Sequence, residues 1–475
     1  MSRQIKANYE QQLLLPQSLE DWVPAEHPAR FIREFVDSLD LKGLGFKVED
    51  NIEGRAYYSS ELLLKVWLFG YYQRVRTTRQ LEKQCKDNMS LIWLTGMNYP
   101  DHNTLWRFWN NNRKSIKSVF RESVLLASKL DMVSMIINAV DGTKIKAYAS
   151  KEGALNRKKL EVLQKQIDLS IEEMEKEIES KEKEEEGSYS LPEELQDRKK
   201  LKEKIQEALK EMKEINRDNM NPDEKEARIM RSEGKMTLCY NAQAVVDEKN
   251  RIVLAVEVVN DENDRQMLMP MIEKVEETVL RKAGVTIADS GYATAEQIQT
   301  ARKKDNKILL NLSRKSTIPQ GPRKEEKYHN SNFRYDEETD VMICPESKEM
   351  RYARTKKSQN KRYELRVYRS PDCQCCRVRE QCTTSKTGRS VKLNPYYKDI
   401  MYQQELQQIE ENKILLSKRK AMIESHFGNA KHNHGFRRFQ TKGLEKVRQE
   451  WSMLNTVINL SKIFKVWATG KIKLA

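Results

Sequence analysis

The sequence predicts a mixed α/β protein whose sheet is interrupted by a long helical insert. Apolar runs typical of buried strands recur along the chain, and the short turn DEKN joins two of them as a strand pair. Amphipathic helices at 264–280 and 294–305 alternate with the later runs. The order strand, insert, strand, strand, helix, strand, helix, strand is typical of a mixed sheet. The predicted strands are 133–149, 235–247, 250–261, 283–294 and 307–312.

The first 125 residues are predicted to be helical and rich in aromatic side chains. A broad apolar face runs through 59–75, with Ser59 and Ser60 as N-cap candidates, and shorter helices are expected at 77–88 and 100–120. Basic side chains lie among the aromatic residues of these shorter helices. This pattern favours a DNA-binding domain similar to a helix-turn-helix, and an ordinary helical bundle is the alternative.

The predicted insert covers residues 153–230. Apolar residues from 160 to 178 and from 201 to 212 are spaced by threes and fours, and Gly and Pro interrupt the pattern at 184–194. We therefore expect a long helical hairpin, and its charge runs are most simply solvated faces. Residues 314–395 have little regular pattern and are rich in Lys, Arg, Tyr and Cys, and helices return over 396–475.

The charge balance predicts a polyanionic partner. The 475 residues carry a formal charge of +15 and a pI near 9.2, and each neutralised phosphate adds affinity for nucleic acid. A basic protein without such a partner is the alternative. No apolar run reaches the length of a membrane span, and the N-terminus lacks the apolar core of a signal peptide, so we expect a cytoplasmic protein with no membrane partner.

Two aspartates share one sequence context and are candidate metal ligands. Asp141 and Asp289 each end an apolar run and are followed by a glycine within two positions. Carboxylates at strand ends gather where open α/β sheets bind ligands, and a helical Glu424 would complete a set able to hold Mg²⁺. For a single aspartate, a turn or helix-cap role is the alternative. Asp247, Asp261 and Asp264 are rival candidates, and they are predicted to have such structural roles.

The cysteines predict a second, structural metal site. Four of the seven fall within CQCCRVREQC at 373–382, and the chain shows no export signal, so metal binding is favoured over disulfides. Cys375 is spare, and reduced thiols without metal are the alternative. Cys85 and Cys239 lie in apolar contexts and are expected in the core. The expected Zn²⁺ ligands are Cys344, Cys373, Cys376 and Cys382.

The order of several motifs resembles bacterial insertion-sequence transposases of the DDE class, and specifically the IS eleven-eighty-two group. VDGTKIKAYAS is similar to the first catalytic strand of that group, and IADSGY is similar to its second aspartate motif. YNAQAVVD and NDENDRQMLMPM are similar to elements between them. Glu424 with Lys431 resembles the Glu-Lys half of the C-terminal signature, whereas Ser417 and Lys420 stand at its Tyr and Arg positions.

The resemblance implies an RNase H-like core with Asp141, Asp289 and Glu424 as the metal-binding triad. It implies Mg²⁺, for which Mn²⁺ can substitute, and a homodimer that cuts the element's ends and joins the 3′-hydroxyls to target DNA. The expected core comprises 126–152 and 231–313, completed by 396–475. A catalytically silent DNA-binding regulator is the alternative, and a simple nuclease does not explain residues 1–125. The cations expected at DNA are Arg76, Arg79, Arg107, Lys144, Lys420, Lys431, Arg437 and Arg438.

Overall fold

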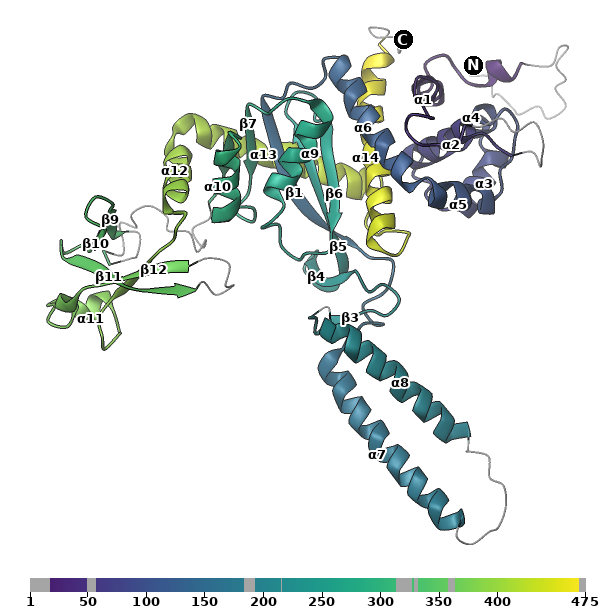
Figure 1. The fold of residues 1–475 in the computed structure, drawn as a ribbon. Coiled ribbons are helices and arrows are strands. Elements are labelled where there is room, and N and C mark those ends of the chain that lie inside the picture. Colours follow the sequence, from purple (N-terminus) through teal and green to yellow (C-terminus); the bar gives the residue numbers. More distant parts are fainter. Residues whose placement is uncertain are drawn as a thin grey trace, which may run out of the picture.

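A mixed sheet lies at the centre of the computed structural model (Figure 1). The structure describes residues 18–48, 57–182, 193–214, 216–312, 327–328, 332–357 and 364–469. The strand order is β6-β5-β1-β7-β8, and β4 pairs with the beginning of β5. This confirms the predicted mixed α/β class. The strands are β1 (Ile137–Lys146), β4 (Arg228–Ser232), β5 (Lys235–Asp247), β6 (Val253–Val259), β7 (Val285–Ala288) and β8 (Ile308–Leu310).

Strand β1 is the branch point of the sheet. It pairs antiparallel with β5 along one edge, from Asn138↔Asp247 to Lys146↔Cys239, and parallel with β7 along the other. β7 in turn pairs parallel with β8, and β5 pairs antiparallel with β6. Because neighbours cover both edges of β1, its first residues are buried, as the apolar run predicts.

Helices cover the sheet on either side. α9 (Leu268–Val279) contacts β5 and β6, and α13 (Glu410–Gly428) contacts β1, β5, β7 and β8. α10 (Ala295–Lys303) packs on α12 (Tyr397–Gln408), and α12 contacts β8. The π-helical segment η4 (Asn429–Asn433) continues α13. Residues 437–439 then hydrogen-bond to Lys146 at the end of β1, which brings the C-terminal region back to the first strand.

The long helix α14 (Leu444–Trp467) joins the sheet to the N-terminal helices, because it packs on β6, α6, α2 and α1. Its buried polar side chains satisfy backbone groups of its neighbours. Asn459 accepts a hydrogen bond from the Val253 amide at 2.8 Å and donates to the Val253 carbonyl at 2.9 Å. Gln449 donates to the Trp109 carbonyl at 2.7 Å. The helix therefore forms part of both regions.

From residue 18 to residue 129 the described residues form helices only. Helix α2 (Ser60–Tyr72) confirms the prediction for 59–75, and the Ser59 hydroxyl accepts from the Leu62 amide at 3.2 Å as its N-cap. The helix predicted over 100–120 is two helices, because the backbone breaks at Asn112. The other elements are η1 (Leu19–Trp22), α1 (Pro28–Asp37), α3 (Thr78–Asp87), α4 (Met89–Leu94), α5 (His102–Asn111) and α6 (Arg113–Lys129).

The predicted hairpin is present and projects away from the sheet (Figure 1). It consists of α7 (Arg157–Glu182) and α8 (Glu193–Glu214), closed at the base by β2 (Leu155–Asn156) and β3 (Asn219–Met220). It has its own apolar cluster, which includes Leu160, Ile167 and Met212. Most of the predicted break at 184–194 lies outside the described residues. None of the helices in the described part of the chain has the length and apolar character needed to cross a bilayer.

A second sheet corrects the prediction that 314–395 has little regular structure. Its strands follow the order β13-β12-β11-β10-β9, and each described pair is antiparallel. A small apolar cluster lies on it, with Phe333, Met350 and Tyr368. Figure 1 shows it on the far side of the central sheet from the N-terminal helices. The strands are β9 (Arg334–Asp336), β10 (Val341–Ile343), β11 (Glu349–Lys357), β12 (Glu364–Arg369) and β13 (Ser390–Leu393).

Candidate active site

The register between β1 and β7 brings Asp141 and Asp289 to the same level of the sheet. The two strands run parallel, and their last described pair is Ala139↔Ile287. Asp141 and Asp289 each lie two residues beyond that pair. Since side chains alternate along a strand, equal offsets on parallel neighbours give both carboxylates the same orientation. The two acids lie at the same level of the sheet, but only Asp289 follows the end of its strand, because β1 continues past Asp141 to Lys146.

An arginine from α13 lies against the first of these acids. The Arg419 Nη1 atom is 2.9 Å from Asp141 Oδ2, and both side chains are largely buried, at 15% and 19% exposure. Burial raises the pKa of Asp141 to about 6, with Asp289 adding to the rise, while Arg419 opposes it. Asp141 also accepts from the Gly142 amide at 2.8 Å. This carboxylate is thus partly desolvated and balanced by one cation.

A third acid, Asp264, belongs to the same group, although the sequence analysis classed it as a structural cap. It lies in the loop before α9, and its Oδ1 atom accepts from Asn241 Nδ2 at 2.6 Å and from Gln243 Nε2 at 2.7 Å. Lys144 Nζ is 3.6 Å from the same oxygen. Burial lowers the pKa of Lys144, against the raising effect of Asp264 and Asp141. The sequence signal was present in NDENDRQ, which offers several acids between a strand and the following helix.

Two glycines make room for this group. A Cβ atom on Gly142 would lie 2.2 Å from Gln243 Nε2 and 2.8 Å from Asp264 Oδ1. A Cβ atom on Gly291 would lie 2.9 Å from Asp289 Oδ1 and 3.7 Å from Asp264 Oδ2. Asp264 and Asp289 therefore both reach the backbone at Gly291. The glycine that follows each aspartate in the sequence is explained by these close approaches.

The fully buried Tyr292 interacts electrostatically with all three acids. Its hydroxyl donates to Gln243 Oε1, and Gln243 also donates to Asp264, so the tyrosine and the acid are linked through one amide. The pKa of Tyr292 is well above its usual value because of burial and then the charges of Asp264, Asp141 and Asp289. The phenol is therefore a neutral hydrogen-bond donor that fixes the Gln243 amide.

Glu424 lies on the same helix as Arg419 but five residues later, and its side chain is exposed. Five residues turn an α-helix through about 500°, so these two side chains leave the helix in different directions. Within the described ranges, no three His, Cys, Asp or Glu side chains are arranged so that they could hold a metal ion. The structure brings Asp141 and Asp289 together and leaves Glu424 apart from them.

The predicted DNA-contacting cations occupy three regions. Arg79 and Arg107 are exposed on the N-terminal helices, and Lys144 lies within the group of acids. Arg76 links two regions, because it donates to the carbonyls of Gly435 and Arg438 and stacks over Phe436. The rest come from α13 and the segment after it, where Lys420, Arg437 and Arg438 are exposed and Lys431 is half-buried.

The cysteine group lies in the second sheet and its loops. Burial raises the pKa of Cys382, and Arg389 opposes the rise, whereas Cys373, Cys344 and Cys376 add to it. The four thiols predicted from the sequence therefore lie near one another, and all are free of disulfides. Cys375 is exposed, and Cys85 and Cys239 are buried, as predicted. No three of the thiols are arranged as a metal site among the residues that the structure describes.

Two family models match the chain. Residues 343–464 match the model described as a transposase DDE domain, and residues 17–111 match the model described as a transposase domain (DUF772). Both models describe transposases. The first match contains Glu424, Arg419 and the four clustered thiols, and the second covers most of the N-terminal helices. No curated protein matches the chain. The matches support a transposase.

Proposed function

We propose that this chain is a DDE transposase of the IS eleven-eighty-two family. It binds the ends of an insertion sequence, hydrolyses a phosphodiester bond there and joins the freed 3′-hydroxyl to target DNA. The observation that carries the proposal is the pair Asp141 and Asp289, which lie at equal offsets on parallel neighbouring strands. The mixed sheet with α13 laid across it is consistent with the RNase H-like core that the resemblance implies.

The donor set suits Mg²⁺ or Mn²⁺. Mg²⁺ is typically held by one or two carboxylates together with substrate phosphate, and Asp141 and Asp289 supply two carboxylates at one level of the sheet. Glu424 is proposed as the third ligand from the resemblance alone, because its exposed side chain does not lie with the two aspartates in this structure. When bound, divalent cations would supply the charge that clamps the attacking and leaving oxygens of the phosphodiester.

The residues around the acids have distinct tasks in this proposal. Arg419 balances the charge of Asp141 while no cation is present, and Lys144 is the second buried cation within reach of an incoming phosphate. The Gln243 amide fixes Asp264, and the neutral Tyr292 hydroxyl fixes Gln243. Arg419 takes the place beside the acids, whereas Lys420, at the signature position, is exposed. The arginine role of the signature is thus assigned to its neighbour.

The proposal divides the chain by task. Residues 1–125 bind the element's ends, 126–152 with 231–313 and 396–475 form the catalytic core, and 153–230 is an accessory hairpin. The protein acts as a homodimer on DNA. Structural Zn²⁺ in the second sheet is proposed from the proximity of four thiols around Cys382, since four thiolates suit a tetrahedral zinc site.

The second candidate is a catalytically silent DNA-binding regulator. The observation that favours it is the Asp141–Arg419 ion pair, because an arginine bound to a metal ligand competes with the metal. The presence of Asp, Asp and Glu at all three triad positions favours the enzyme. The two candidates differ in one measurable property, strand cleavage.

Asp289→Asn tests the proposed function. The variant keeps the side chain's shape and removes one ligand charge, so cleavage of a labelled duplex carrying the element's end should collapse with Mg²⁺ and with Mn²⁺. Duplex binding should survive, because phosphate contacts elsewhere supply it. Asp261→Asn is the matched control, since the exposed Asp261 carboxylate forms an ion pair with Arg228. Cleavage by Asp289→Asn at the parent's rate would refute the assignment, and a parent that binds but never cuts would favour the regulator.

A further inference from the structure

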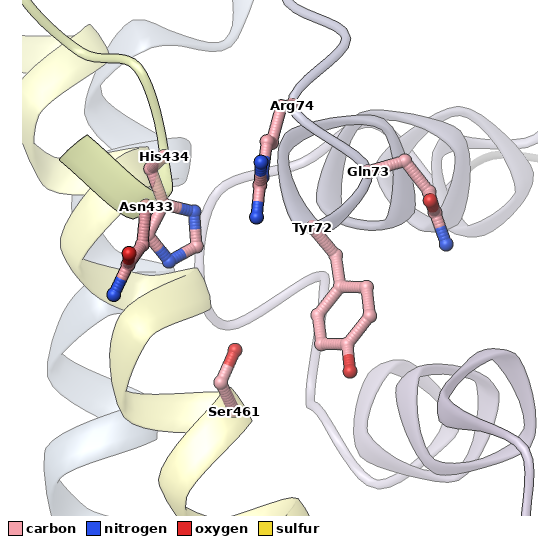
Figure 2. A pocket seen from close by; sticks show the side chains of 6 residues that line it. All are labelled: Tyr72, Gln73, Arg74, Asn433, His434 and Ser461. Atoms are coloured by element: carbon pink, nitrogen blue, oxygen red, sulfur yellow. The ribbon is translucent and has the colours of Figure 1, made fainter. Parts of the chain in front are cut away.

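A cavity lies where the N-terminal helices meet the C-terminal part of the chain (Figure 2). Its volume is about 490 Å³, and its walls come from the end of α2 and the residues after it, from the end of η4 with the next residue, and from α14. Figure 2 shows the Arg74 side chain extending toward the His434 ring across this space. Hydroxyl, amide, imidazole and guanidinium groups line it. The lining residues are Tyr72, Gln73, Arg74, Asn433, His434 and Ser461.

The surroundings of the cavity are positive. No carboxylate is among its described lining residues, and every lining side chain carries a group that can donate a hydrogen bond. Burial lowers the pKa of His434, and the charges of Arg74, Arg76 and Lys462 lower it further. Two arginines therefore lie around this ring, with a lysine whose own pKa burial lowers to about 7. The His434 Nδ1 atom is buried without a hydrogen-bond partner in the part of the chain that the structure describes. A positive cavity with spare donors suits an anion.

The backbone at Arg74 is held in a conformation that disfavours any residue with a Cβ atom. Its φ angle is 65°, and it follows the end of α2. The Val75 amide donates to the Gly70 carbonyl at 2.8 Å and the Arg74 amide to the Tyr71 carbonyl at 3.1 Å, which is a Schellman motif. Glycine is the usual residue at this position of the motif. The arginine therefore stands where backbone stability alone would favour glycine, and its side chain lines the cavity.

We propose that this cavity holds a phosphate group of the DNA backbone. The inference rests on the proposed function and adds a contact point to it. Arg74 comes from the N-terminal helices, whereas Asn433 and His434 follow the helix that carries Arg419. A phosphate bound between them is held by both regions at once. Arg76 already joins the same regions through the carbonyls of Gly435 and Arg438, so the phosphate site is built on an existing contact.

The test measures DNA binding by Arg74 variants in the absence of divalent cations. A fluorescein-labelled duplex is titrated with the full chain at several salt concentrations. A lost phosphate contact makes the slope of log K against log salt less negative by about 0.9. Arg74→Gly and Arg74→Gln should each show that less negative slope and bind the duplex about eightfold more weakly at about 0.1 M salt. Arg74→Lys keeps the charge and should keep the slope.

Stability supplies a second readout. Arg74→Gly should melt at the parent's temperature or above it, because the glycine relieves the left-handed backbone, whereas Arg74→Gln keeps that strain. The matched control is Arg251→Gly, which makes the same change at another arginine with positive φ (58°) that does not line the cavity. The control should keep the parent's salt slope. A change in slope equal to that of Arg74→Gly would overturn the inference.

The remaining outcomes separate this site from the proposed function. A parent that binds the duplex, with Arg74→Gly and Arg74→Gln variants that bind it with an unchanged slope, refutes the phosphate site alone. A parent that does not bind duplex DNA refutes both. Inorganic phosphate at constant ionic strength distinguishes a free phosphate ligand from a DNA phosphate. If it raises the melting temperature of the parent only, while the Arg74 variants bind DNA as the parent does, the site takes free phosphate and the DNA assignment fails.

Discussion

Replacing Gly142 with alanine should destabilise the protein, whereas the same replacement at Gly428 should stabilise it. The added Cβ atom would lie 2.2 Å from Gln243 Nε2, 2.8 Å from Asp264 Oδ1 and 2.9 Å from Asn241 Oδ1. Contacts below about 3 Å force the neighbours to move. Gln243 has little freedom to do so, because it is fully buried and is bonded to Tyr292 and Asp264.

The expected cost follows from these contacts. Overpacking a well-packed site costs about 1–3 kcal/mol, and a weakened hydrogen bond to a charged group adds up to about 1.5–3 kcal/mol. Alanine in place of glycine recovers about 0.4–1 kcal/mol by restricting the unfolded chain. The free energy of unfolding should therefore fall by about 2–3 kcal/mol. Cleavage should fall as well, since Gly142 is adjacent to Asp141.

Urea unfolding followed by tryptophan fluorescence measures the change. Gly428→Ala, near the end of α13, is the matched control, because no heavy atom lies within 4 Å of its Cβ position. That variant should gain about 0.5–1 kcal/mol, as alanine is favoured over glycine in a helix. If Gly142→Ala unfolds at the parent's urea concentration or higher, the packing described around Gln243 and Asp264 is wrong.

Three further predictions concern other parts of the molecule. Burial raises the pKa of Glu450 to about 7 from 4.5, so between these pH values the folded chain holds a proton that the unfolded chain releases. The free energy of unfolding should therefore fall by up to about 3 kcal/mol as pH rises from about 4.5 through 7, and melts of Glu450→Gln at several pH values should not show that loss. If the four clustered thiols form a zinc site, elemental analysis of untagged protein should find about one zinc per chain, which Cys376→Ser should lose and Cys375→Ser should keep. Stable protein without zinc would instead mean that the thiols bind no metal. Replacing 157–214 with a Gly/Ser linker should leave the core's melting temperature unchanged, because the hairpin has its own apolar cluster, and loss of the whole fold would show that its boundary is misplaced.

The sequence predicted those parts of the site that depend on local pattern. Apolar runs that end in an acid identified Asp141 and Asp289, because a buried strand segment must be apolar and the residue after it need not be. Asp289 follows the end of β7, whereas β1 continues past Asp141 to Lys146. The hairpin was predictable because its apolar residues repeat at helical spacing. Neither inference needed to know which strands are neighbours.

Other parts depend on long-range packing. Asp264 lies between two elements in the sequence, and only the approach of Gly142 and Gly291 to it shows that it is more than a cap. Whether Arg419 or Lys420 reaches Asp141 depends on the rotation of α13 about its axis, which one position changes by about 100°. The second sheet was missed because β11 (Glu349–Lys357) is exposed over most of its length and lacks apolar alternation.

The position of α14 has a consequence for how the protein is made. This helix supplies hydrogen-bond partners to β5 and β6 and packs on α1, α2 and α6, yet it is the last described element of the chain. Translation at about 5–20 residues per second separates the synthesis of β1 from that of α14 by roughly 15 s to a minute. Between the synthesis of Asp289 and that of α13, a nascent chain has both aspartates but neither α13 nor the helix that closes the core. A ribosome-bound or prematurely terminated product therefore lacks Arg419, the partner of Asp141, and under the proposed function it should not cleave DNA.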